Sequence, residues 1–185
     1  MFLLCGLGNK GSEYQYTRHN IGYLVIDRFS EKFRIPVKQK VCGCRIGMNE
    51  NVLLAKPDTF MNISGAPVSS LAGKMGVKPE DLILIHDDLD MEFGKIRIKL
   101  NGGDGGHRGV RSVADALQSK LFYRVKIGIG RNPFMEPEDY VLSRFKDDET
   151  EILTESLDKA VDAIHTFIFE SKEKAMSMFN KKGVL

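Results

Sequence analysis

Cysteine is scarce in this chain, and its scarcity excludes two classes of protein. The 185 residues hold three cysteines, which cannot all pair with one another, so a disulfide-stabilised secreted scaffold is excluded. Cys42-x-Cys44 has no second cysteine pair that would complete a zinc site. A reducing compartment is the simplest location for such a chain, and we expect a cytoplasmic protein.

Long apolar runs are absent as well. The apolar start, Phe2–Leu7, is too short to span a membrane and lacks the basic residues that lead a signal peptide, so no membrane partner is expected. The sequence contains no internal repeat, low-complexity tract or Pro/Ser-rich linker. With 42% apolar and 28% charged residues, residues 1–185 have the length and composition of a single domain.

A strong excess of one charge is the third absence. The formal net charge of +2 is too small to indicate nucleic-acid binding, so only local clusters of cations would do so. One cluster lies in Lys95–Leu100, where apolar residues alternate with Lys95, Arg97 and Lys99. This alternation is typical of a half-solvated strand, and the same row of cations can neutralise a phosphate backbone.

Apolar residues recur at spacings that alternate between helix and strand. Ile21, Val25, Phe29 and Phe33 recur every four positions, which predicts one buried helix face. Interleaved strands and helices predict an α/β fold, a three-layer sandwich whose central sheet is mixed because two of its strands form a hairpin turning at Asn49-Glu50. The predicted strands are Met1–Leu7, Val37–Met48, Asn51–Ala55, Leu82–Ile85, Lys95–Leu100 and Tyr123–Gly130. Three helices are predicted to begin at Ile21, near Pro67 (ending at Gly76) and after Gly109. A long amphipathic helical segment is predicted at 147–181 (Asp147–Lys181).

A histidine stands at the opening of the first predicted helix. His19 precedes Asn20, and either Thr17 or Asn20 is expected to cap the free backbone N–H groups there. The positive end of a helix disfavours imidazolium, which leaves such a histidine neutral and able to accept a proton. Taken alone, His19 is more simply interpreted as a residue that hydrogen-bonds within its own turn.

Two glycine-rich motifs are candidates for phosphate binding. Gly6-x-Gly8-x-x-Gly11 matches the dinucleotide fingerprint in form, but no helix follows at once and no acidic residue follows a second strand at the required distance. Asn101–Gly109 leads into a helix and is a ready anion site, but it lacks the G-K-[ST] of a nucleotide triphosphatase. We therefore expect no nucleotide cofactor.

Polar side chains follow three of the predicted strands, and together they suggest a hydrolytic site. If Asn9, Asn62 and Asp87 share one edge of the sheet with His19, the carboxylate of Asp87 accepts a hydrogen bond from His19 and leaves its other nitrogen as a base. Because G-x-S-x-G is absent, the nucleophile would be water. The amides of Asn9 and Asn62 can donate to a developing oxyanion.

Metal catalysis is the alternative for the same residues. Asp87, Asp88 and Asp90 have the oxygen ligands of a magnesium site, although such clusters more often cap turns or pair with Lys and Arg. The sequence has no paired His/Cys set for zinc. We expect neither a metal nor another cofactor.

Five longer blocks resemble bacterial peptidyl-tRNA hydrolases. In order along the chain they are G-L-G-N-K-G-x-x-Y-x-x-T-R-H-N-x-G, K-P-D-T-F-M-N-I-S-G, H-D-D-L-D-M-x-x-G-K-I-R-I-K, G-G-D-G-G-H-R-G-V-R-S-V and Y-R-V-K-I-G-I-G-R. The resemblance extends from residue 3 to about residue 145, so it covers essentially the whole predicted domain. It implies a cofactor-free, usually monomeric esterase that releases tRNA from the peptidyl-tRNA left by stalled translation.

The resemblance also implies roles for individual residues. His19 would be the general base, with Asp87 stabilising its basic form, and Asn9 would help to distinguish N-blocked from free aminoacyl-tRNA. Phe60, Met61 and Asn62 would line the peptide and ester site. The remaining positions, which would contact the tRNA end and acceptor stem, are Tyr14, Lys99, Arg131 and the glycine-loop helix that starts with His107 and Arg108.

Two positions depart from the family pattern. Arg108 stands where well-studied members have asparagine, and an arginine cannot accept a hydrogen bond to position water but can grip a phosphate. Lys10 stands where the family often has proline, which affects the stiffness of the turn. The alternatives are a non-catalytic RNA-binding relative of the same fold, which intact His19 and Asp87 disfavour, and a metal phosphoesterase, which a chelator would inactivate.

Overall fold

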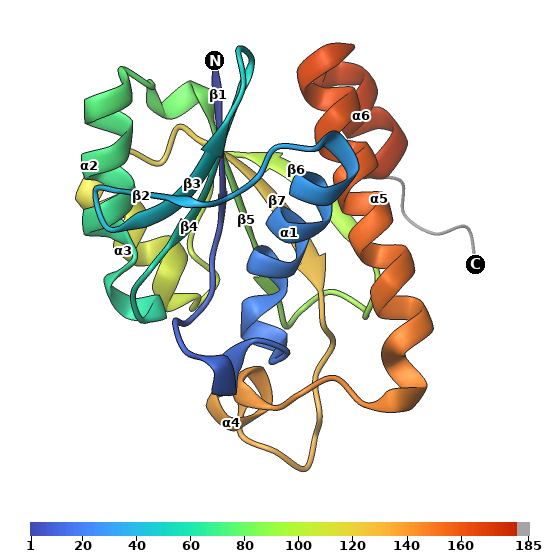
Figure 1. Cartoon of the computed structure of the whole chain (residues 1–185). Coiled ribbons are helices and arrows are strands. Elements are labelled where there is room, and N and C mark those ends of the chain that lie inside the picture. The colour runs from blue at the N-terminus through green and yellow to red at the C-terminus, as the bar shows by residue number, and fades with distance from the viewer. Residues whose placement is uncertain (181–185) are drawn as a thin grey trace.

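A computed structural model describes residues 1–180, and it shows one seven-stranded sheet between two layers of helices (Figure 1). The strand order is β2-β3-β4-β1-β5-β7-β6. The central strands β4, β1, β5 and β7 are parallel, whereas the β2-β3, β3-β4 and β6-β7 pairs are antiparallel. The strands are β1 (Phe2–Gly6), β2 (Gln39–Val41), β3 (Cys44–Met48), β4 (Val52–Pro57), β5 (Leu82–Asp88), β6 (Ile96–Leu100) and β7 (Tyr123–Gly128).

The helices cover both faces of the sheet and enclose one apolar core on each face. On one face α2 and α3 pack together, and on the other α1 packs against α5, with α6 beyond it (Figure 1). The predicted α/β sandwich with a mixed sheet is therefore confirmed. The α-helices are α1 (Ile21–Phe33), α2 (Gly65–Met75), α3 (Arg108–Leu117), α4 (Pro137–Leu142), α5 (Thr150–Phe169) and α6 (Lys172–Phe179). The 3-10 turns are η1 (Ser12–Tyr14), η2 (Arg18–Asn20), η3 (Met61–Ile63), η4 (Pro79–Asp81) and η5 (Asp147–Glu149).

Close packing of two glycines brings the start of α1 onto the centre of the sheet. A Cβ at Gly22 would lie 2.4 Å from the carbonyl oxygen of Ile85, and a Cβ at Gly6 would lie 2.2 Å from that of Gly22. Neither contact is compatible with a side chain, so only glycine lets the helix approach β1 and β5 this closely. The approach carries His19, in the turn just before α1, towards the end of β5.

Three local predictions were wrong or incomplete. Val37–Met48 is two strands, because Cys42 and Gly43 take positive φ angles of 50° and 74° and turn the chain between β2 and β3. Neither Thr17 nor Asn20 caps a helix through its side chain. The segment 147–181 breaks after Phe169, and its last residue, Lys181, lies outside the described residues. The prediction that 1–185 is one domain stays a prediction.

Candidate active site

Asp87 binds two histidines at the carboxyl end of β5. Nδ1 of His19 lies 2.9 Å from Oδ1 and 3.0 Å from Oδ2 of Asp87, and Nε2 of His107 lies 3.0 Å from Oδ1. Asp87 is buried, with 3% of its surface exposed, and the side chains of His19 and His107 are 13% and 8% exposed. The three groups thus form one compact cluster that reaches solvent mainly through His19.

The carboxyl group of Asp87 is held in its ionised form. Burial by itself raises its pKa, but the electrostatic attraction and hydrogen bonds of His19 and His107 outweigh burial, and the pKa lies well below its usual value. Asp87 therefore only accepts hydrogen bonds, so each histidine must donate to it through an N–H group.

The hydrogen bonds around the cluster fix the tautomer of both histidines. Nδ1 of His107 accepts from the backbone N–H groups of Gly109 and Val110, at 3.2 and 3.3 Å, so the proton of a neutral His107 is on the Nε2 that faces Asp87. A neutral His19 donates its Nδ1 proton to Asp87, and this tautomer has its lone pair on Nε2. This is the protonation pattern that a general base requires.

A third histidine, His86, supports the cluster from inside the sheet. Its Nδ1 donates to the backbone carbonyl of Asp87 at 2.7 Å, and its ring meets that of His107 edge-on at 4.8 Å. Burial, and secondarily the nearby His107, hold the pKa of His86 well below its usual value, so its ring is neutral. Sequence reasoning passed over His86, although it directly precedes Asp87 in the H-D-D-L-D block.

Hydrogen bonds hold both the side chain and the backbone of Asn9. Its Oδ1 accepts the N–H of Met61 at 2.7 Å, which turns its Nδ2 away as a free donor. The backbone of Asn9 exchanges two hydrogen bonds with the side chain of Asn20, at 2.8 and 2.9 Å. Asn20 thus fixes the backbone of the turn at Asn9. The sequence did not indicate this role, because a polar residue before a helix is usually a helix cap.

The loop after β4 carries the other predicted peptide-site residues, and they differ in exposure. Met61 is buried in the core between the sheet and α2-α3, whereas Asn62 is exposed. Phe60 is 47% exposed and meets the ring of Tyr14 edge-on at 6.4 Å, with the ammonium of Lys10 5.5 Å from its centroid. Phe60 therefore does not fill the core, and it forms an aromatic surface with Tyr14 beside Asn9.

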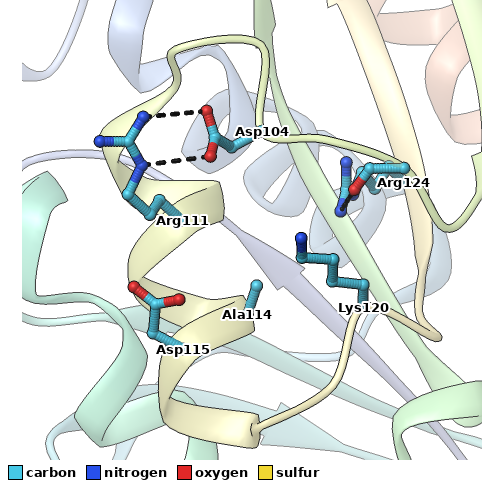
Figure 2. A pocket seen from close by; sticks show the side chains of 7 residues that line it. Asp104, Arg111, Ala114, Asp115, Lys120 and Arg124 are labelled. Carbon is cyan, nitrogen blue, oxygen red and sulfur yellow. Dashed lines mark hydrogen bonds and ion pairs between the residues drawn. The ribbon is translucent and has the colours of Figure 1, made fainter.

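Cations gather on the other side of the cluster, over β6, β7 and α3. Lys99 on β6 pairs in register with Arg124 on β7, and Arg124 donates to the carbonyls of Gly102 and Gly103. Arg124 borders a cavity of about 190 Å³ with Lys120 and with Arg111, which Asp104 binds through two hydrogen bonds (Figure 2). Arg124, Lys120 and Arg111 were not among the predicted site residues, although the alternation in Tyr123–Gly130 could have indicated Arg124, which lies opposite Lys99.

The remaining predicted tRNA-contacting residues are engaged with carboxylates. Arg131 binds Asp90 at 2.7 Å, and Arg108 forms an ion pair with Glu138 of α4. Both arginines are more than half exposed, so these pairs are screened by solvent and exchangeable. Arg108 connects α4 to the start of α3.

The structure also places the candidate metal ligands. One ligand atom each from His19, Asp87 and His107 lie within 4.8 Å of one another, so these three could hold a cation if their mutual hydrogen bonds were given up. This set could not be predicted from the sequence, because its two histidines are far apart in the chain and meet only in the folded protein. Asp88 pairs with Lys126 and Asp90 with Arg131, so the Asp87, Asp88 and Asp90 group is not one ligand set.

The fold and the site together define a hydrolytic enzyme of the α/β class. A histidine with one free nitrogen is held by a buried carboxylate, beside a free amide donor and a cationic surface. None of the helices in residues 1–180 combines the length and apolar character needed to cross a bilayer.

Comparison with known proteins names the family. The family model described as peptidyl-tRNA hydrolase matches residues 3–184. A peptidyl-tRNA hydrolase of Thermodesulfovibrio yellowstonii is 42% identical over 98% of this chain and 100% of its own length, and one of Citrifermentans bemidjiense is 43% identical over 97% and 98%. The crystal structure of peptidyl-tRNA hydrolase from Acinetobacter baumannii superposes with a TM-score of 0.90 at 33% identity, covering 97% of this chain and 94% of that one. The chain belongs to the peptidyl-tRNA hydrolase family.

Proposed function

We propose that this protein hydrolyses the ester between a peptide and tRNA with water activated by His19. Nε2 of His19 takes a proton from water, whose oxygen forms a bond to the ester carbonyl carbon. The bond from that carbon to the ribose oxygen then breaks, and His19 returns the proton to the ribose oxygen. The supporting observation is the hydrogen bond from Nδ1 of His19 to ionised Asp87.

The amides around the cluster would stabilise the intermediate and choose the substrate. The free Nδ2 of Asn9, together with exposed Asn62, would donate to the oxyanion that develops on the carbonyl oxygen. Phe60, Met61 and Tyr14 would receive the peptide end and the terminal nucleotide. His107 is better placed to hold Asp87 than to contact tRNA, because its Nε2 faces the carboxylate.

We assign the tRNA acceptor stem to the cationic side of the site, at Lys99, Arg108 and Arg131. Phosphate oxygens would replace Glu138 and Asp90 as partners of the two arginines. We also propose a cytoplasmic monomer; the cytoplasmic location is supported by the three cysteines, which are free as expected in a reducing compartment. The non-catalytic RNA-binding alternative is not favoured, because the proton-transfer groups are complete.

The direct test is release of tRNA from an N-blocked aminoacyl-tRNA, beside the unblocked form, with and without a chelator. We expect cleavage of the blocked ester alone, at a rate that a chelator does not change. Binding without cleavage would support the RNA-binding alternative. Cleavage that is lost with chelator and restored by a divalent cation would assign His19, Asp87 and His107 to a metal site instead.

Neutralising two cations tests the tRNA surface. The double variant Lys99→Gln, Arg108→Gln should weaken substrate affinity and reduce the slope of log Kd against log salt by about 1.5, because each lost phosphate contact removes about 0.7–0.9 from the slope. The control is Lys74→Gln, Lys78→Gln, which neutralises two exposed lysines between the end of α2 and the start of β5, whereas the candidate site is at the other end of β5. An equal slope in the double variant and wild type would place the tRNA elsewhere.

A further inference from the structure

A second cavity lies on the other side of Asn9 from the cationic surface. It has a volume of about 490 Å³, within the range of small-ligand sites, and lies between the start of α1 and strands β3 and β4. Asn9, Gly11, Ser12 and Gln15 border it beside the candidate active site. The proton-transfer cluster does not use this cavity.

Three cations from neighbouring strands line its wall. Lys40 on β2 is in register with Arg45 on β3, and Arg45 is in register with Lys56 on β4. Like charges directly opposite one another destabilise a sheet. Two carboxylates reduce this cost, since Lys56 pairs with Asp27 and both Lys40 and Arg45 approach Asp58, at 3.0 and 3.9 Å. Three cations against two carboxylates leave one positive charge unmatched.

Arg45 and Lys56 keep hydrogen-bonding capacity for a further acceptor. The side chain of Arg45 lines the cavity and is 40% exposed, and its 3.9 Å contact with Asp58 is too long for a hydrogen bond, so its guanidinium can donate to an acceptor in the cavity. The side chain of Lys56 is 9% exposed, with its ammonium 5.5 Å from the ring centroid of Tyr23. Cations that line a cavity and are only partly neutralised form strong hydrogen bonds to an anion, so the wall is suited to a bound carboxylate.

The position of the cavity indicates which part of the substrate supplies the anion. In the strand order β2-β3-β4-β1-β5-β7-β6, the cavity wall is at one end and the cationic tRNA side at the other, with Asn9 and Asp87 between them. The ester joins tRNA to peptide at this centre, so tRNA on one side directs the peptide towards the other.

We infer that this cavity is a subsite for an acidic side chain of the peptide, whose carboxylate is bound by Arg45 and Lys56. The inference rests on the proposed function, because the peptide is placed by its ester bond to tRNA. It predicts a preference among peptidyl-tRNAs that the proton-transfer cluster alone would not produce.

The test compares three substrates that share the ester-linked residue. N-acetyl-Glu-Gly-tRNA, N-acetyl-Gln-Gly-tRNA and N-acetyl-Lys-Gly-tRNA present a negative, a neutral and a positive side chain one residue before the ester. For the wild-type protein we expect kcat/KM to be about tenfold higher for the Glu than for the Gln substrate, the size of one charge-assisted hydrogen bond, and lowest for the Lys substrate.

Variants of Arg45 assign the preference to the cavity. Arg45→Gln should bring kcat/KM for the Glu substrate close to that for the Gln substrate, and Arg45→Glu should favour the Lys substrate. Lys74→Gln, on the far end of α2, removes the same charge outside the cavity and should leave the preference intact.

The possible failures are distinguishable. Equal rates for the three substrates with wild-type protein would overturn the subsite and leave the hydrolase intact. Arg45→Gln lowering all three rates equally would also overturn it, because the cavity would then serve tRNA or the fold. No cleavage of any substrate would refute the proposed function, and the subsite with it.

Discussion

His19→Ala is expected to lower kcat by about 10²–10⁴-fold and to change tRNA affinity little. The range is what a positioned general base contributes, and His19 is the histidine of the cluster with a free nitrogen and access to solvent. The cationic surface that would hold the acceptor stem lies on other elements, β6, β7 and α3, and the substitution leaves it unchanged. Single-turnover cleavage of N-acetylated aminoacyl-tRNA and a separate binding titration measure the two effects.

His165, which contacts the C-terminal end of α1, provides a matched control. His165 lies on α5, where its ring stacks on Phe33 with centroids 5.2 Å apart, and His165→Ala removes an imidazole without touching the cluster. It should retain the wild-type rate. A His19→Ala protein that also kept most of its rate would refute the assignment of His19 as the base.

Asp87→Asn should lower kcat by a similar factor, about 10²–10⁴-fold, with a smaller change in KM. The amide is nearly the same size, but it carries no charge and offers one acceptor oxygen where the carboxylate serves both histidines. His19 is then free to adopt the tautomer with a protonated Nε2, which cannot accept a proton from water. Retention of the wild-type kcat would show that the charge of Asp87 is dispensable.

The same variant predicts a pH dependence of stability. The pKa of Asp87 is lower in the folded than in the unfolded state, so the unfolded state binds its proton first as pH falls. The stabilisation by the carboxylate is therefore fully present above the unfolded value, about pH 4, and is lost at lower pH as the folded group titrates. Urea unfolding of wild type and Asp87→Asn should show that the wild-type protein stays the more stable one down to about pH 4, and that its advantage shrinks below that. A difference that disappears by pH 6 would contradict this account.

Local sequence patterns predicted most of the helices and strands, because their buried apolar residues recur at the spacing typical of each. The four-residue recurrence from Ile21 gives α1, and the continuous apolar run at Leu82 gives the start of the central strand β5. The turn at Cys42 was missed because its positive φ belongs to a residue type that rarely adopts it. The break after Phe169 was also missed, since apolar residues run up to Ile168 at the end of α5 and resume in α6 at Ala175, Met176 and Phe179.

The sequence indicated most of the residues of the candidate site but not the hydrogen bonds between them. Asn9 and Asn62 follow strands β1 and β4, and Asp87 lies at the carboxyl end of β5, which is longer than the predicted Leu82–Ile85. The parallel pairing of these strands brings their carboxyl ends together. His19 and Asp87 are 68 positions apart, so their hydrogen bond depends on the close approach of Gly22 to the sheet. The hydrogen bond of His107 to Asp87 was not predicted. In the sequence, His107 belongs to a glycine-rich loop that indicates an anion site, and only the conformation of this loop directs its side chain towards Asp87.

The state of the two histidines at Asp87 is the most direct test of the central claim, that this carboxylate leaves His19 with a free Nε2. Imidazole ¹⁵N chemical shifts at neutral pH distinguish a protonated from an unprotonated ring nitrogen, and the four histidines can be assigned by single substitutions. We predict a proton on Nδ1 and none on Nε2 for His19, and the opposite for His107. A His19 that carries its proton on Nε2 in the wild-type protein would contradict the proposed base and the role given to Asp87.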